Sequence, residues 1–153
     1  MEIINRNCVD LFILNNKNEV LLEKKTYNHP ILKGMWVPVG GKIDNNETPL
    51  QAINRECKEE INININPKKF LTTTYKIKNN NITLQGNIIF FYGRFNNIKK
   101  LNILEGNGLG FFNIKEIKNI KIQKLHLNAI KYLLKNIIKR KKLTTKKINF
   151  KKC

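Results

Sequence analysis

The chain has 153 residues, which makes one domain the default and allows one sizeable hydrophobic core. Its three cysteines, at positions 8, 57 and 153, include no Cys-x-x-Cys pair, which argues against a disulfide framework and a structural zinc site. The N-terminus has no signal-peptide pattern, and the longest apolar run, 88–92, is too short to cross a bilayer. We therefore expect a cytoplasmic protein without a membrane anchor.

The formal net charge is +18, and two explanations for it are open. Lysine and arginine gain affinity for polyanions by displacing counterions from phosphates, so the charge favours a nucleotide or RNA partner. Lysine, asparagine and isoleucine are also abundant throughout the chain, as the codons of an A/T-rich genome would produce whatever the function.

The first third of the chain predicts a hairpin followed by a polar loop. Residues 8–14 and 19–24 are apolar, strand-like runs separated by an asparagine-rich turn. Residues 26–33 are polar and broken by Pro30. The lysines beside this loop, among them Lys25, either reach a phosphate or are ordinary solvated side chains.

A strong helix start signal follows a Gly40-Gly41 turn. Thr48 has the residue type of an N-cap, Pro49 suits the first helical position, and Gln51 completes a capping box. We predict a helix over 49–61. Its buried face is expected to carry the apolar residues that repeat at three- and four-residue steps, namely Leu50, Ile53, Cys57 and Ile61.

The same helix brings three carboxylates together. Glu56, Glu59 and Glu60 lie at i, i+3 and i+4, where like charges oppose helix formation. Arg55 supplies one positive charge, which is too little to neutralise these groups and Glu47. Hard cations such as Mg²⁺ or Mn²⁺ favour clustered carboxylates and free carbonyls, so the pattern indicates a metal site. The alternative is a solvated acidic helix face.

The remaining chain predicts more strands, a second helix and a tail. Strands are expected over 70–78, 82–95, 101–104 and 108–114. Leucine and isoleucine at helical spacing predict a helix over 124–139, in which His126 reads as structural rather than catalytic. We expect one domain over 1–138 and a basic tail over 139–153, for which disorder is favoured over an RNA-binding extension or a helix end.

The region 34–63 resembles the Nudix box. Gly41, five further residues, Glu47, seven further residues and then Arg55-Glu56-Cys57-Lys58-Glu59-Glu60-Ile61 follow its pattern. Asn62 replaces the usual glycine and Cys57 a larger aliphatic residue. Asparagine tolerates the left-handed conformation that ends a helix, and cysteine behaves as a small hydrophobe, so neither change removes a carboxylate. The stretch 40–52 is especially similar to the MutT branch, whose members hydrolyse nucleoside triphosphates, including oxidised ones.

This resemblance implies a fold and a set of site residues. The fold is an α/β/α sandwich with a mixed central sheet between helices. We expect Glu56, Arg55 and Glu47 in catalysis, with Glu56 the favoured base. The metal ligands would be Glu56, Glu59, Glu60, the Gly40 carbonyl and Glu105, although Glu105 reads equally as a turn carboxylate. Lys42, Gly41 and Lys25 would bind substrate phosphates. Asn119 is a guess for base recognition.

Three functions follow from the resemblance. The favoured function is Mg²⁺-dependent hydrolysis of a nucleoside diphosphate-linked substrate, most simply a nucleoside triphosphate cleaved to monophosphate and pyrophosphate. The second is removal of pyrophosphate from the 5′ end of RNA, which would give the basic tail a purpose. The third is an inactive nucleotide- or RNA-binding module, against which the intact carboxylates argue. The oligomeric state is left open.

Overall fold

The structure is a computed structural model that describes residues 1–97, 101 and 107–139. Glu105, most of the strand predicted over 101–104 and the tail from 140 onward lie outside the described residues. No helix in the described part is long and apolar enough to span a membrane.

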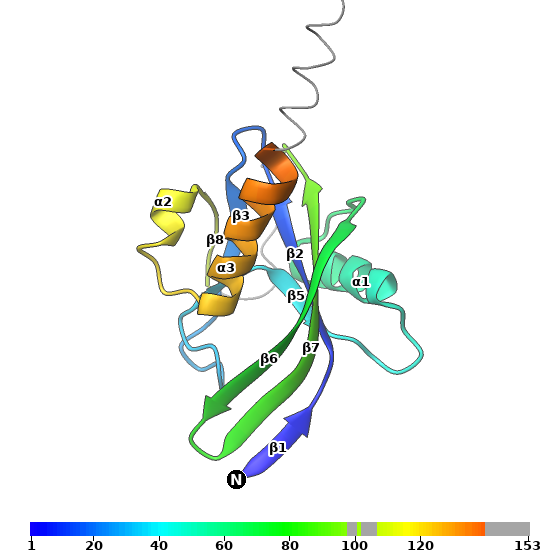
Figure 1. Ribbon diagram of the computed structural model, residues 1–153, viewed down its shortest axis with the longest axis vertical. Helices are drawn as coiled ribbons and strands as arrows, with labels where there is room; N and C mark the ends of the chain where they lie inside the picture. The colour runs from blue at the N-terminus through cyan, green and yellow to red at the C-terminus, as the bar shows by residue number, and fades with distance from the viewer. Residues whose placement is uncertain (98–100, 102–106, 140–153) are drawn as a thin grey trace, which may run out of the picture.

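A mixed sheet of eight strands forms the centre of the molecule (Figure 1). Its path runs β1-β7-β2-β3-β4, and β5, β6 and β8 pair with β2, β7 and β3. The strands are β1 (Glu2–Asn5), β2 (Cys8–Leu14), β3 (Val20–Lys24), β4 (Trp36–Val37), β5 (Val39–Lys42), β6 (Lys68–Asn79), β7 (Ile82–Arg94) and β8 (Leu109–Phe112). Because β2 runs parallel to β7 and antiparallel to β3, the sheet is mixed, and the predicted α/β class is confirmed.

Helices lie on both sides of this sheet. They are α1 (Pro49–Ile61), α2 (Ile114–Ile117), α3 (Lys124–Tyr132) and the π-helical turn η2 (Leu133–Ile138), which continues α3. Figure 1 shows α1 on one side of β2 and β7 and α3 on the other, while the β6–β7 hairpin extends away from the helices with β1 beside it. The sandwich that the sequence predicts is therefore present.

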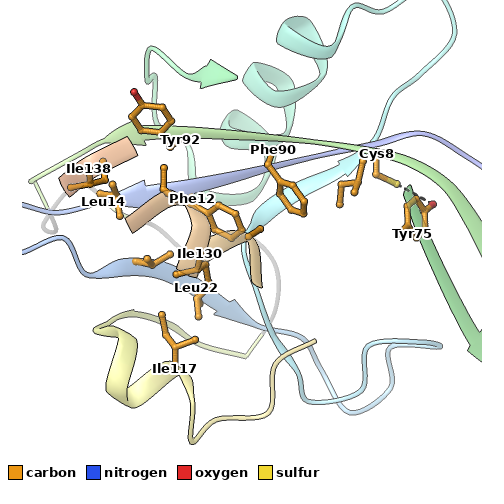
Figure 2. Close-up of a cluster of buried hydrophobic side chains, with 14 of the residues drawn as sticks. Cys8, Phe12, Leu14, Leu22, Tyr75, Phe90, Tyr92, Ile117, Ile130 and Ile138 are labelled. Carbon is orange, nitrogen blue, oxygen red and sulfur yellow. Dashed lines mark hydrogen bonds between the residues drawn. The ribbon is translucent and has the colours of Figure 1, made fainter. Parts of the chain in front are cut away.

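Alternation along β2 separates two cores. Successive side chains of a strand point to opposite faces, so Val9, Leu11 and Ile13 pack beneath α1 with Ile53, while Cys8, Phe12 and Leu14 pack beneath α3. Figure 2 shows the second core, in which Ile130 and Ile138 lie over the same strands. Both faces of β2 are buried, so its single charged residue, Asp10, is also buried, at 8% exposure.

Helix α1 begins and ends where its local sequence predicts. The Thr48 hydroxyl accepts a hydrogen bond from the Gln51 amide, the Gln51 side chain accepts one from the Thr48 amide, and Asn62 takes the left-handed conformation (φ 52°). Leu50 corrects the prediction of the buried face, because it is 48% exposed. It lies in the first turn of the helix, whose buried residues begin at Ala52.

The C-terminal helix differs from its prediction in its hydrogen bonding. A continuous α-helix was expected over 124–139, but the backbone widens to a π-helical turn after Tyr132. The Gly40-Gly41 turn corrects a further prediction, because both glycines lie in strand β5, where they pair with Asp10 and Val9 of β2. The segment called the glycine turn is therefore the part of β5 that leads into the acidic loop. Two short elements, β1 and α2, were not predicted. β1 has mostly exposed residues and no apolar alternation, and it forms because it adds to the edge of β7 in parallel register.

Candidate active site

Arg55 is the centre of the polar network on the α1 face. Its Nε and Nη2 donate to the two carboxylate oxygens of Glu47 at 2.8 and 3.1 Å, in the bidentate geometry that favours arginine over lysine. Its Nη1 donates to Glu56 at 2.8 Å and to Glu59 at 3.2 Å, and its Nη2 also reaches the Lys42 carbonyl at 2.9 Å. One guanidinium therefore ties the acidic loop, the glycine turn and helix α1 together.

The Glu56 carboxylate lies directly against the backbone of Gly41. A Cβ atom added at Gly41 would lie 2.3 Å from Glu56 Oε1, so only glycine leaves room for this carboxylate. The Glu56 side chain is 13% exposed, so it is partly withdrawn from solvent. Burial raises the pKa of Glu56 and the Arg55 guanidinium opposes that rise, so the carboxylate is partly desolvated yet paired.

The Glu60 carboxylate lies beside Gly40, the residue before Gly41. It is 2% exposed and accepts a hydrogen bond from the Gly40 amide at 3.0 Å. Lys25 lies 3.6 Å from Glu60 and also forms an ion pair with Glu23, a buried carboxylate of β3. Burial raises the pKa of Glu60, with the neighbouring Glu23 adding to the rise. Lys25 supplies the counter-charge for two buried carboxylates.

A cavity of about 250 Å³ opens beside the glycine turn. Its lining includes Gly40, Gly41, Lys42 and Lys25 together with the apolar residues Ile31, Leu84, Ile88 and Leu125. This volume is slightly below the roughly 300–1,000 Å³ of ordinary ligand pockets, which also combine apolar side chains with a smaller number of polar groups.

Asp10 and His126 form a buried pair in the wall of this cavity. His126 Nε2 lies 2.8 Å from Asp10 Oδ2, and His126 is 5% exposed. Asp10 Oδ1 fills the space beside Gly40, where an added Cβ atom would lie 2.2 Å away, so the pair abuts the turn that Glu60 binds. Burial raises the pKa of Asp10, and the hydrogen bond from His126 opposes the rise.

The predicted site residues are thus arranged around the two glycines, with some exceptions. Glu56 and Glu60 contact Gly41 and Gly40, whereas Glu59 is 53% exposed and is held only by Arg55 among the contacts seen. Asn119 donates a hydrogen bond to the Lys115 carbonyl. It is not one of the residues that line the cavity in the described part of the chain. Trp36 packs edge-on against Phe112, with ring centroids 4.7 Å apart.

Sequence reasoning missed Glu23, Asp10 and the pairing of Asp10 with His126. The available signal was a carboxylate within an otherwise apolar strand: Glu23 follows Val20-Leu21-Leu22, and Asp10 lies within Cys8–Leu14. Such residues are buried with their strands and need a partner there. Their partners lie far away in sequence, which is why the sequence alone did not pair them.

The oxygen-rich turn fits a divalent cation in its chemistry. Among the described residues, no three His, Cys, Asp or Glu side chains are already grouped to hold a metal ion. Within the described part of the chain, Glu60 Oε2 is nevertheless a buried oxygen without a hydrogen-bond donor. Glu60 accepts a hydrogen bond from the Gly40 amide, and Glu56 lies against Gly41. Carboxylate and carbonyl oxygens are the ligands that hard divalent cations take. Lys25 is the cation that now neutralises this position.

Comparison with known proteins places the chain in a family. The NUDIX domain model matches residues 4–133, so the chain belongs to the NUDIX domain family, whose hydrolases generally use a divalent metal. An 8-oxo-dGTP diphosphatase of Proteus vulgaris is 34% identical over 70 residues, or 45% of this chain. The match spans 61% of that relative, less than two thirds of its length.

Solved structures agree in fold. The MutT protein of Methanosarcina mazei Go1 superposes with a TM-score of 0.68 at 20% identity, covering 85% of this chain and 92% of that one. The dihydroneopterin triphosphate pyrophosphohydrolase of E. coli superposes with a TM-score of 0.69 at 16% identity, covering 83% of this chain and 94% of that one. At such identities the likeness shows the fold alone. This fold agrees with the family match over residues 4–133.

Proposed function

We propose that the protein hydrolyses nucleoside triphosphates, oxidised ones included, to monophosphate and pyrophosphate with Mg²⁺. One observation carries this proposal: Glu56 of the Arg55-centred network lies against Gly41, and Gly40, Gly41 and Lys42 also line a cavity with apolar residues in its wall. A triphosphate bound at the two glycines would leave its nucleoside beside these apolar residues. The name of the Proteus vulgaris relative supports the same substrate class.

We assign each residue the following role. Lys42 lines the cavity, where its ammonium would hold phosphate oxygens. Lys25 lies in the same wall, already beside Glu60 and Glu23, so it couples the phosphate site to the buried carboxylates. Arg55 holds Glu47 and Glu56 in place. This positioning fits phosphoryl chemistry, in which catalysis is mostly orientation and charge stabilisation.

Glu56 is the proposed base for the attacking water. It is the partly desolvated carboxylate of the network, and a raised pKa brings an acid closer to the range useful for proton transfer near neutral pH. Glu47 is the alternative, but its pKa is lowered by the Arg55 hydrogen bonds, which makes it the weaker base. Glu56, Glu59, Glu60 and the Gly40 carbonyl would hold Mg²⁺, which supplies charge neutralisation at the phosphates; Glu105 would complete this set.

The test is a nucleotide screen with the full chain and Mg²⁺. Triphosphates of the common bases, 8-oxo-dGTP, a nucleoside diphosphate sugar and a dinucleoside tetraphosphate would be compared by phosphate and pyrophosphate release. We expect pyrophosphate from at least one triphosphate. Faster turnover of RNA carrying a 5′ triphosphate than of any free nucleotide would instead favour the second function. Removal of 139–153 should then damage RNA turnover while sparing free nucleotides. Binding without turnover of any of these compounds would favour the inactive module.

A further inference from the structure

A second hollow adjoins the cavity beside the two glycines. It has a volume of about 450 Å³ and lies between the β1–β2 connection, residues 43–46 after β5, and Gly86 of β7. Arg6 and Lys42 line both the cavity and this hollow, so the two compartments meet at two cationic side chains. Both residues are exposed, so a ligand in either compartment can reach them.

Backbone contacts between distant segments fix the walls of this hollow. The Asn7 carbonyl accepts a hydrogen bond from the Ile43 amide at 2.9 Å, and the Arg6 amide donates to the Gln85 carbonyl at 3.0 Å. A Cβ atom added at Gly86 would lie 2.1 Å from the Arg6 carbonyl, so β7 can approach the β1–β2 connection this closely only at a glycine. The hollow is therefore held in shape by three segments of the fold.

The Asn7 side chain supplies a hydrogen-bond donor whose identity is fixed. Asn7 Oδ1 accepts a hydrogen bond from the Asn87 amide at 3.1 Å, and a backbone amide can only donate, so this bond shows which side of the Asn7 amide is the oxygen. The other side, Nδ2, is the donor of an exposed residue that lines the hollow. A side-chain amide does not titrate, so this donor is present at every working pH.

The hollow also carries positive charge. Arg6 and Lys42 form no ion pair with any described residue. Asp44 is the one carboxylate that lines the hollow in the described part of the chain, and it lies 3.5 Å from Arg55. Two cations and a fixed amide donor favour a ligand that is anionic and whose outer atoms are hydrogen-bond acceptors, as phosphate oxygens are.

The hollow begins where the residues proposed for chemistry end along β5. Glu56 lies against Gly41. Lys42 is the next residue, and its carbonyl accepts a hydrogen bond from Arg55 Nη2 at 2.9 Å. A phosphate chain whose scissile bond lies at Gly41 would therefore continue past Lys42 into the hollow, away from the cavity proposed for the nucleoside.

We infer that this hollow is a diphosphate site: Arg6, Lys42 and the Asn7 amide bind the two phosphates that hydrolysis releases, and inorganic pyrophosphate binds there as the product. The substrate class that follows is a nucleoside triphosphate. A nucleoside diphosphate sugar would instead place one phosphate and a neutral sugar beside the two cations. The inference rests on the proposed function for the nucleotide in the cavity, but pyrophosphate binding can be measured without turnover.

The first experiment titrates the full chain with inorganic pyrophosphate by calorimetry. Divalent ions are left out, so that no metal can link the ligand to the carboxylates. Asn7→Asp keeps an oxygen for the Asn87 amide and replaces the donor by a negatively charged acceptor. We expect its affinity for pyrophosphate to fall by at least about tenfold, because like charges would then face each other. No binding of millimolar pyrophosphate to the parent, or an unchanged affinity in Asn7→Asp, would overturn the inference.

A nucleoside monophosphate separates the two compartments. Asn7 lines the hollow and is not one of the described residues that line the cavity, so Asn7→Asp should change monophosphate affinity by less than about threefold. Arg6→Gln changes a residue of both compartments and should weaken pyrophosphate and monophosphate alike. Equal losses for the two ligands in Asn7→Asp, or an unchanged pyrophosphate affinity in Arg6→Gln, would contradict a separate diphosphate site.

Asn128→Asp is the matched control for net charge. Asn128 is exposed on α3 and lines neither compartment in the described part of the chain. At moderate salt its pyrophosphate affinity should stay within about threefold of the parent, because distant exposed charges are screened. A loss equal to that of Asn7→Asp would show that affinity follows the net charge of the chain, and would overturn the inference.

The two proposals fail differently. If no triphosphate is hydrolysed but pyrophosphate binds to the parent and at least tenfold less tightly to Asn7→Asp, the proposed function fails and the diphosphate site stands. If triphosphates are hydrolysed but Asn7→Asp leaves the ratio of kcat/KM between a triphosphate and a nucleoside diphosphate sugar unchanged, the site fails and the function stands.

Discussion

The two faces of the sheet treat their buried polar groups differently. On the α1 face, Arg55 binds Glu47, Glu56 and Glu59, all within a short stretch of sequence, and these charges satisfy one another. On the α3 face, Asp10 and His126 are 116 positions apart, and His126 Nδ1 has no partner in the described part of the chain. The comparison indicates that the groups proposed for chemistry are set by local sequence, whereas the Asp10–His126 pair depends on the tertiary fold.

The largest expected effect is at Glu56 on the α1 face. Glu56→Gln keeps the side-chain volume and removes the charge, so turnover should fall by about two to four orders of magnitude, the range for losing a positioned acid or base. Stability should change by less than about 1 kcal/mol, because the amide still accepts from Arg55 and a partly desolvated charge disappears. Steady-state kinetics and urea unfolding would measure the two effects.

The control for Glu56 is Lys58→Gln on the same helix. Lys58 is exposed and lies outside the Arg55 network, so the turnover rate of Lys58→Gln should stay near that of the parent. A Glu56→Gln enzyme within about threefold of the parent on its best substrate would remove Glu56 from the mechanism. The base would then be Glu47 or Glu105.

The two glycines of the turn should respond differently to the same change. In Gly41→Ala the new Cβ meets the end of the Glu56 side chain, which can move, so activity should fall about 10- to 100-fold with little loss of stability. In Gly40→Ala it meets the Val9 carbonyl at 2.2 Å, which belongs to β2, so the free energy of unfolding should fall by about 1–3 kcal/mol or more.

Kinetics and denaturant unfolding on both glycine variants would test this contrast. Equal losses of stability in the two would mean that Glu56 is not free to move away from Gly41. An active Gly41→Ala enzyme would mean that the close approach of Glu56 to the turn is not needed for turnover.

Elements set by local sequence could be predicted, whereas elements set by tertiary contacts could not. Helix α1 could be predicted to the residue because Thr48, Pro49, Gln51 and Asn62 fix its ends through local hydrogen bonds and backbone preference. Leu50 was misplaced because helical spacing shows which residues share a face but not how far the sheet beneath extends. Strand β1 exists only through its pairing with β7, which no local pattern encodes.

The site shows the same limit. The Gly41–Glu56 contact lies within one motif, so the resemblance named both residues together. His126 read as structural because a single histidine on an apolar helix face gives no sign of what it faces. Asp10 completes the pair only because strand alternation turns it toward α3, on the same face as Phe12.

A smaller effect is expected from Mg²⁺ on the thermal midpoint. A cation that binds the native carboxylates and not the unfolded chain stabilises by mass action, about 1.4 kcal/mol at ten times its Kd. For a chain of this size that corresponds to a rise of roughly 3–6 °C. Calorimetric scans with and without millimolar Mg²⁺ would measure it, with Glu60→Gln expected to lose most of the rise. An identical response from Glu60→Gln, or none in the parent, would contradict the proposed ligand set.

The smallest expected effect is the acid sensitivity of the Arg55–Glu47 pair. The hydrogen bonds from Arg55, then that from the Asp44 amide, hold the pKa of Glu47 below its ordinary value of 4.5. The folded state therefore binds this proton less tightly than the unfolded chain, so the stabilisation is present above pH 4.5 and is lost as the pH falls through the folded pKa. In urea unfolding between pH 3 and 6 without divalent ions, the stability difference between the parent and Glu47→Gln should shrink as the pH falls. Glu2→Gln, on the exposed strand β1, gives the baseline for removing one surface carboxylate. A parent-to-Glu47→Gln difference that stays constant over this range would show that the pair orders the loop without stabilising the fold, and would confine Arg55 to positioning Glu56.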